Sequence, residues 1–250
     1  LKSSPDTCSA SCRAIAVWVS SGSRGSHCKQ KGLMPIESYI ESRSSAEDDY
    51  LYRLWRATNI HLVRPHMVSG HVEGLLLKML VEMIRPANVL EIGTFTGYSA
   101  ISMSYGLPSH GRIYTFDVNE ELEDFARRWI EGSRRASSIT YTIGDVLEIL
   151  PDFAEKNGNL RFDLAFIDGN KRQYAEYYTL VKKYLSPGGY ILADNTLWDG
   201  HVIDPAYDRD SQTLGIRRFN DLLAEDETVE KVILPIRDGL TIVRKKAEWQ

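Results

Sequence analysis

Cysteine is scarce in this sequence and confined to its beginning. Among 250 residues there are three cysteines, Cys8, Cys12 and Cys28, and none follows. A disulfide-stabilised secreted domain distributes cysteines through its core, so this class is excluded for the rest of the chain. The first two cysteines also lack the second closely spaced pair of a zinc-binding module. The sequence therefore indicates a cytoplasmic protein whose core needs no covalent cross-links.

Long apolar runs and an excess of positive charge are also absent. No run approaches the roughly 18 apolar residues of a membrane-spanning helix, so no membrane segment is predicted. The 30 lysines and arginines are outnumbered by 34 aspartates and glutamates, which gives a net charge of −4. Because phosphate contacts depend on a surplus of basic side chains, this balance disfavours nucleic acid as a partner.

The first 33 residues differ in composition from the remainder. They contain eight serines, no methionine, five basic residues and one acidic residue, and they lack periodic apolar positions. We therefore expect residues 1–33 to be a disordered or non-native extension, with a targeting peptide as the alternative. Residues 34–250 are expected to form a single domain that begins with helices.

Two kinds of hydrophobic pattern alternate along this domain. Apolar residues three or four positions apart predict helices, and short apolar runs predict strands. Helices are expected at residues 47–59, 71–85, 97–105, 119–130, 146–153, 171–185 and 212–224, and strands at 89–92, 112–116, 139–143, 163–167, 190–193, 229–235 and 240–244. Alternating strands and helices form a parallel sheet covered on both faces, whereas Asp238-Gly239 between the last two runs predicts a hairpin. The sequence thus predicts an α/β fold of the Rossmann-like class I methyltransferase type, with a mostly parallel seven-stranded sheet and a C-terminal antiparallel hairpin.

Polar residues follow the predicted strands, at the sheet edge where such folds bind ligands. The first strand leads into Gly93 and Gly97, whose spacing lacks the additional glycine of a dinucleotide-binding loop. The second strand ends at Asp117, which can accept hydrogen bonds from both hydroxyls of an adenosine ribose, and Glu91 adds a further carboxylate. Such carboxylates suit a cationic nucleoside without phosphates, and therefore S-adenosylmethionine. An incomplete NAD site and a plain tight turn are the alternatives.

Asp168, Asp194 and Asn195 follow the fourth and fifth predicted strands. Neighbouring strands lie about 4.8 Å apart, so these oxygen-bearing side chains are expected to converge. A ligand set made only of oxygens favours a hard divalent cation, Mg²⁺ first, with Ca²⁺ or Mn²⁺ as alternatives. A helix cap beside a polar loop would explain the same residues without a metal.

Lys171 lies three residues after Asp168 and is expected to face the same crevice. A divalent cation nearby disfavours a protonated ammonium, and a neutral lysine can act as a general base. A solvated surface lysine is the alternative. Trp198 and Tyr207 are candidates for the wall of an aromatic substrate site, with ordinary packing as the alternative.

These segments resemble the cation-dependent O-methyltransferases, the group of catechol O-methyltransferase and caffeoyl-CoA O-methyltransferase, and in particular bacterial-type small-molecule enzymes. The resemblance covers about residues 36–246 and is carried by VLEIGTFTGYS at 89–99, FIDGNK at 166–171 and ADNTLWDG at 193–200. Gly169 and Asn170 depart from the Asp-Ala-Asp-Lys pattern that is common in the family. Residues 201–212 correspond to a shortened substrate-binding insertion, which favours a small free phenol over a coenzyme A thioester.

The resemblance implies metal-dependent transfer of a methyl group from S-adenosylmethionine to a hydroxyl of a small, catechol-like phenol. It implies cation ligation by Asp168, Asp194 and Asn195, catalysis by Lys171 as the base, and a homodimer. The expected cofactor-binding residues are Val68, Glu91, Gly93, Thr94, Ser99, Asp117, Asp145, Val146, Asp168 and Asn170. The alternatives are methylation of a hydroxylated uridine in tRNA and an S-adenosylmethionine-binding protein without catalytic activity.

Overall fold

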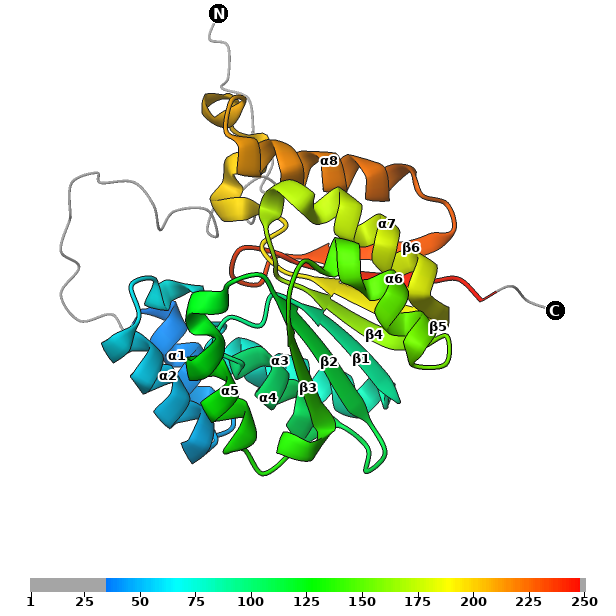
Figure 1. The fold of residues 1–250 in the computed structure, drawn as a ribbon. Coiled ribbons are helices and arrows are strands. Elements are labelled where there is room, and N and C mark those ends of the chain that lie inside the picture. Colours follow the sequence, from blue (N-terminus) through cyan, green and yellow to red (C-terminus); the bar gives the residue numbers. More distant parts are fainter. Residues whose placement is uncertain (1–34, 248–250) are drawn as a thin grey trace, which may run out of the picture.

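A seven-stranded sheet lies at the centre of the structure, which is a computed structural model that describes residues 35–247 (Figure 1). The strand order is β3-β2-β1-β4-β5-β7-β6. Strands β1 to β5 are parallel, and β7 is antiparallel to both β5 and β6. The predicted fold is therefore confirmed, including the C-terminal hairpin. The prediction for residues 1–33 lies outside the described residues.

The elements alternate as the hydrophobic pattern predicts. The strands are β1 (Asn88–Ile92), β2 (Arg112–Asp117), β3 (Ile139–Ile143), β4 (Phe162–Ile167), β5 (Leu185–Ala193), β6 (Val229–Leu234) and β7 (Leu240–Lys245). The α-helices are α1 (Ile36–Arg43), α2 (Asp49–His61), α3 (His71–Ile84), α4 (Tyr98–Gly106), α5 (Glu123–Glu131), α6 (Val146–Lys156), α7 (Tyr174–Tyr184) and α8 (Ser211–Glu225). Short 3-10 helices are η1 (Pro65–Met67), η2 (Glu120–Leu122), η3 (Ala136–Ser138), η4 (Lys171–Gln173), η5 (Trp198–Ile203) and η6 (Pro205–Tyr207).

Helices cover both faces of the sheet. One face packs against α6, α7 and α8, and the other packs against α3 and α4, with α2 and α5 beside α4 (Figure 1). Because both faces are covered, the central strand β4 is apolar and buried at every position except Asp163. Within residues 35–247, no helix has the length and apolar character needed to cross a membrane.

Two elements extend three or more residues beyond their predicted bounds, and two predicted helices begin with a 3-10 turn. Helix α6 ends at Lys156, three residues after its predicted end, because Ala154 prolongs its buried stripe. The helix predicted at 119–130 starts with η2, and α5 begins only at Glu123. Strand β5 begins five residues early because Leu185 pairs with Phe162 of β4, although a turn-like Pro-Gly-Gly sequence follows. The helix predicted at 171–185 starts with the 3-10 turn η4, and regular α-helix begins only with α7.

Candidate active site

A cavity of about 1020 Å³ lies at the carboxyl ends of the parallel strands. Residues at the ends of β1 to β5 line it in turn: Gly93, Asp117, Gly144, Asp168 and Asp194. The amide of Asp168 donates to the carbonyl of Ile92 at 2.8 Å, and the amide of Asp194 donates to that of Ile167 at 3.0 Å. The hydrogen-bonded ladder thus continues into the cavity wall. Small-molecule sites commonly have about 300–1,000 Å³, so this cavity has room for a cofactor and a second ligand.

Most of the predicted site residues meet in this cavity. Ten line it: Gly93, Asp117, Asp145, Val146, Asp168, Asn170, Lys171, Asp194, Asn195 and Trp198. Five do not: Val68, Glu91, Thr94, Ser99 and Tyr207. The first four of these five are buried, and Tyr207 stacks on His201 with a ring-centroid distance of 3.5 Å. The roles assigned to all fifteen stay predictions.

Backbone amides fix the carboxylate of Asp117 on one side of the cavity. Its Oδ2 accepts a hydrogen bond from the amide of Phe95 at 2.7 Å, and its Oδ1 accepts one from the amide of Asn119 at 2.9 Å. A carboxylate has about four acceptor sites, so each oxygen can accept a further bond from a ligand hydroxyl. This geometry fits the ribose of a nucleoside.

Gly93 brings the loop after β1 against the end of β4. Its φ is +101°, and a Cβ atom there would lie 2.3 Å from the carbonyl oxygen of Asp168. Only glycine fits this close approach, which joins the Asp117 side of the cavity to the Asp168 side.

Glu91 is the fourth of the five residues of β1 and does not line the cavity. Its side chain is fully buried, and neither carboxyl oxygen has a hydrogen-bond partner of good geometry among the described residues. Burial raises the pKa of Glu91 to about 8, and the hydroxyls of Ser99 and Thr115, which lie close to the carboxyl, oppose this effect. Thr115 also bonds to Thr94 through their hydroxyls at 2.6 Å. A buried water that donates hydrogen bonds would satisfy the Glu91 carboxyl.

Lys171 is held between two oxygens on the other side of the cavity. Its Nζ donates to Asp168 Oδ1 and to the hydroxyl of Tyr174, both at 2.7 Å. The Tyr174 hydroxyl in turn donates to the carbonyl of Asp194 at 2.9 Å. Tyr174 is fully buried, and its hydroxyl fixes the lysine.

The loop after β5 carries unusual backbone conformations. Asn195, Trp198 and Asp199 all have positive φ, at 58°, 48° and 51°. Non-glycine residues adopt this region rarely, and such strain concentrates at functional sites. The amides of residues 196 and 197 donate to the carbonyls of Gly239 and Asp238, at 3.0 and 2.8 Å, so the turn between β6 and β7 holds this loop.

Negative charge accumulates around Asp194. Burial and the charge of Asp168 raise the pKa of Asp194 to about 6, while Lys171, the Asn195 amide and Arg237 lower it. Among residues 35–247, no three histidine, cysteine, aspartate or glutamate side chains are arranged to hold a metal ion. The predicted ligands are instead two carboxylates and the amide of Asn195, a set that fits a hard cation with several positions left for water or substrate.

Glu73 and Arg237 are among the charged residues of the cavity wall that were not predicted. Glu73 of α3 is only 3% exposed, and it pairs with Arg237 in the turn between β6 and β7. Burial and the charge of Asp194 raise the pKa of Glu73 well above its usual range, and Arg237 opposes this effect. The sequence could have indicated that Glu73 is buried, because Glu73 lies at helical spacing from Leu77 and Val81, which are buried on the same face of α3. Arg237 lies 164 positions away from Glu73 in the sequence, and no sequence pattern indicates that the two residues form a pair.

The strand order and the antiparallel hairpin define a Rossmann-like methyltransferase fold, which solved methyltransferases share. The model of the O-methyltransferase family matches residues 41–246. The chain belongs to this family of S-adenosylmethionine-dependent O-methyltransferases.

Curated relatives and solved structures show the same likeness. Caffeoyl-CoA O-methyltransferase 1 of Eucalyptus globulus is 34% identical over 188 residues, which cover 72% of this chain and 75% of that protein. Caffeoyl-CoA O-methyltransferase 2 of Zea mays is 35% identical over 187 residues, with coverages of 72% and 70%. The O-methyltransferase TomG from Streptomyces achromogenes, solved in complex with SAM, has a TM-score of 0.75 at 28% identity, covering 85% of this chain and 96% of that chain. An O-methyltransferase from Bacillus cereus, solved in complex with SAH, has a TM-score of 0.75 at 29% identity, covering 84% and 97%.

Proposed function

We propose that the protein is a cation-dependent O-methyltransferase that methylates one of two adjacent hydroxyls on a small, catechol-like phenol. The observation that carries this proposal is the cluster of Asp168, Lys171, Asp194 and Asn195 in one cavity wall. It combines oxygen ligands for a cation with an amine 2.7 Å from one of those ligands. The curated relatives are caffeoyl-CoA O-methyltransferases, and the caffeoyl group is itself a catechol, which supports a phenolic acceptor.

Different residues of the cavity have different roles in the proposed reaction. When bound, S-adenosylmethionine supplies the methyl group and a divalent cation supplies positive charge beside the acceptor oxygens. Asp168, Asp194 and Asn195 would hold the cation, and Asp117 would orient the ribose. Lys171 would accept the phenol proton at Nζ, which leaves the acceptor oxygen able to take the methyl group while the methyl–sulfur bond breaks and S-adenosylhomocysteine leaves. Positioning of the two reactants by the fixed wall contributes most of the remaining acceleration.

Chelation of metal ions tests the cation. With Mg²⁺ present, we expect a catechol to be methylated. Excess EDTA should abolish turnover while leaving the affinity for S-adenosylmethionine nearly unchanged, since Asp117 and the cation ligands occupy different sides of the cavity. Methyl transfer is measured with labelled cofactor, and cofactor affinity by calorimetry. Full activity in EDTA would contradict the cation, and absence of turnover on phenols would contradict the acceptor.

The surface gives less support to methylation of tRNA. The basic cluster that could meet a phosphate backbone contains Arg127, Arg128, Arg134 and Arg135. Arg127 pairs with Glu123, Arg134 pairs with Asp48, and Arg135 donates to backbone carbonyls. Bulk tRNA in the same assay distinguishes this alternative, and any turnover excludes a non-catalytic binding protein. The homodimer and the cytoplasmic location stay predictions. Analytical ultracentrifugation would test the homodimer.

A further inference from the structure

Glu73 is a buried carboxylate in the cavity wall to which the proposed reaction assigns no role. Its Oε2 accepts a hydrogen bond from the guanidinium of Arg237. Its Oε1 is also buried and receives no hydrogen bond from a donor group of the described residues, because the side chain beside it is the Asp194 carboxyl, which is itself an acceptor. Burying a carboxylate oxygen without a donor is unfavourable unless a ligand or an ordered water supplies one. An unpartnered oxygen in a cavity wall therefore marks a point of contact.

The surroundings of Glu73 hold its side chain in this orientation. Arg237 also donates to the carbonyl of Ser69, so it joins the start of α3 to the turn between β6 and β7. At the next residue, Gly74, a Cβ atom would lie 2.8 Å from side-chain atoms of both Ser102 and Tyr98. Helix α3 is thus packed closely against α4, which fixes the backbone that carries Glu73.

The nearest negative charges identify the kind of ligand that this oxygen would meet. The carboxylates that act on Glu73 are Asp194 and then Asp168, which are the predicted cation ligands. These acids do not form a direct ligand set of three carboxylates within the described residues. A dication held by Asp168, Asp194 and Asn195 would keep several waters, because Mg²⁺ loses its hydration reluctantly. Those waters need acceptors.

We propose that Glu73 is a positioning residue for this cation, and that its Oε1 accepts a hydrogen bond from a water in the hydration shell of the ion. The inference rests on the proposed function. Arg237 holds the carboxylate in place and offsets part of its charge. Groups of this kind around metal ligands commonly change metal affinity by roughly 10–100-fold when they are removed.

The test is the affinity of the variant Glu73→Gln for Mg²⁺ alone, measured by calorimetry on protein saturated with S-adenosylhomocysteine. Glutamine keeps the size of the side chain and removes its charge. We expect the Kd for Mg²⁺ to rise roughly 10–100-fold while the Kd for S-adenosylhomocysteine stays unchanged. Glu82→Gln is the matched control, because Glu82 lies on the same helix in an exposed pair with Lys78, and it should leave both affinities unchanged.

The possible outcomes separate this inference from the proposed function. Equal Mg²⁺ affinity of Glu73→Gln and the wild type would overturn the role of Glu73 alone. Parallel losses of Mg²⁺ and S-adenosylhomocysteine affinity would show a structural role and would also overturn it. No Mg²⁺ binding by the wild type would overturn the cation and, with it, this inference. If Glu73→Gln does not fold, Glu73→Asp replaces it: a shorter carboxylate should weaken Mg²⁺ binding without affecting the cofactor, and unchanged Mg²⁺ affinity would overturn the role.

Discussion

At the scale of single residues, Lys171 shows how the core positions a reactive group. Its Nζ contacts the Tyr174 hydroxyl and lies 5.9 Å from the ring centroid of Trp198. We expect Lys171→Met to lower kcat roughly 10²–10⁴-fold, because methionine has a similar length but cannot accept a proton. Cofactor affinity should change little. The measurement is kcat on a catechol and on a nitrocatechol with saturating Mg²⁺.

The nitrocatechol makes this experiment specific for proton removal. Its phenol is already acidic, so the loss caused by Lys171→Met should be smaller than on catechol. Lys183→Met provides the control, because Lys183 lies over the ring of Tyr184 at the far end of α7. An equal, small loss on both acceptors would remove Lys171 from the mechanism.

Substitutions at Gly93 and Gly158 distinguish the cost of a positive φ from the cost of a steric clash at Cβ. Both have positive φ, +101° and +76°, but a Cβ atom meets nothing within 4 Å at Gly158, whereas at Gly93 it would clash with the end of β4. Gly158→Ala should therefore lower the free energy of unfolding by only about 1–2 kcal/mol. Gly93→Ala should lower it further and weaken cofactor binding. Denaturant unfolding and calorimetry check this expectation, and equal losses in the two variants would contradict the close approach.

Some residues of the candidate site could be predicted from the sequence, and others could not. The strand-end residues Asp117, Asp168 and Asp194 were predictable, because the topology of a parallel sheet brings the ends of its strands together. The contact of Glu73 with Arg237 could not be predicted, because it depends on how α3 packs against the hairpin of β6 and β7. Sequence periodicity describes one element at a time, so it predicts poorly which side chains of two distant elements meet.

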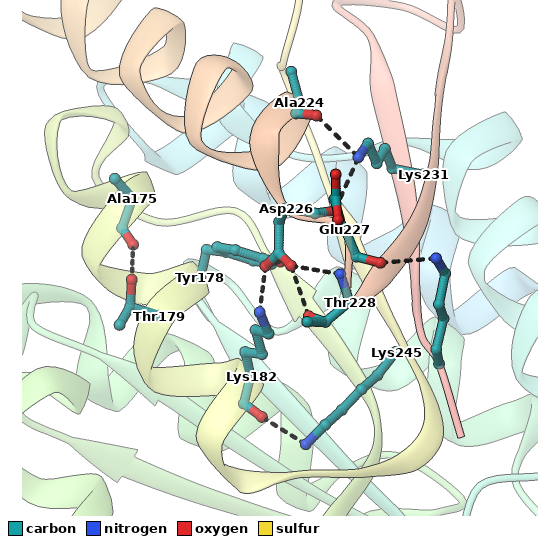
Figure 2. Close-up of polar contacts among 11 residues, drawn as sticks. Ala175, Tyr178, Thr179, Lys182, Ala224, Asp226, Glu227, Thr228, Lys231 and Lys245 are labelled. Carbon is teal, nitrogen blue, oxygen red and sulfur yellow. Dashed lines mark hydrogen bonds and ion pairs between the residues drawn. The ribbon is translucent and has the colours of Figure 1, made fainter. Parts of the chain in front are cut away.

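At the scale of elements, a polar cluster around Asp226 joins the end of α8 to α7 and β6 (Figure 2). The carboxylate accepts hydrogen bonds from the Tyr178 hydroxyl at 2.6 Å, from the amide and hydroxyl of Thr228 at 2.9 and 2.6 Å, and from Lys182. Burial raises the pKa of Asp226, but the hydrogen bonds from Lys182, Thr228 and Tyr178 outweigh it and hold the pKa below its usual range.

We expect Asp226→Asn to lower the free energy of unfolding by about 1–2 kcal/mol at pH 7, because hydrogen bonds to a charged acceptor are lost. The folded-state pKa of Asp226 lies below the value of about 3.9 in an unfolded chain. Its contribution is therefore complete above about pH 5 and is lost as the pH falls through the folded-state pKa. Denaturant unfolding from pH 7 to pH 3 should show the variant approaching the wild type on acidification.

Asp208→Asn is the matched control for this experiment. Asp208 pairs with Arg217 at 2.6 Å, but its side chain is 61% exposed. Exposed ion pairs contribute roughly 0–1 kcal/mol, so this variant should be nearly as stable as the wild type at every pH. A larger loss for Asp208→Asn than for Asp226→Asn would contradict the role of burial.

The helices and strands that could be predicted are those whose buried residues recur at regular spacing in the sequence. Helix α3 keeps Leu77 and Val81 buried at helical spacing, and β4 is apolar at every position except Asp163. Helix α1 was not assigned a range, because none of its residues is buried and its sequence carries no amphipathic stripe. The early start of β5 depends on pairing with β4, which no local pattern shows.

At the scale of the whole molecule, one cavity spans the ends of β1 to β5, and the proposed function assigns the cofactor and the cation to different parts of it. S-adenosylhomocysteine and Mg²⁺, each at about 100 times its Kd, should each stabilise the fold by about 2.7 kcal/mol, or raise Tm by about 5–10 °C. Asp117→Ala should lose the first shift and keep the second, whereas Asp194→Asn should do the reverse. Thermal unfolding measures all four shifts. Loss of both shifts in both variants would contradict the separation of the two halves.

The position of β7 inside the sheet has a consequence for synthesis. Strand β7 follows every other strand in sequence, yet it pairs with both β5 and β6. During translation, a chain that has emerged as far as residue 227 contains β1 to β5 and the Asp117 side of the cavity. Its β5 edge is still unpaired, and the loop with Asn195 has not received its bonds to Asp238 and Gly239. The cavity wall at Asn195 therefore lacks these bonds until β7 has been synthesised, whereas the strands that carry the wall at Asp117 are synthesised much earlier.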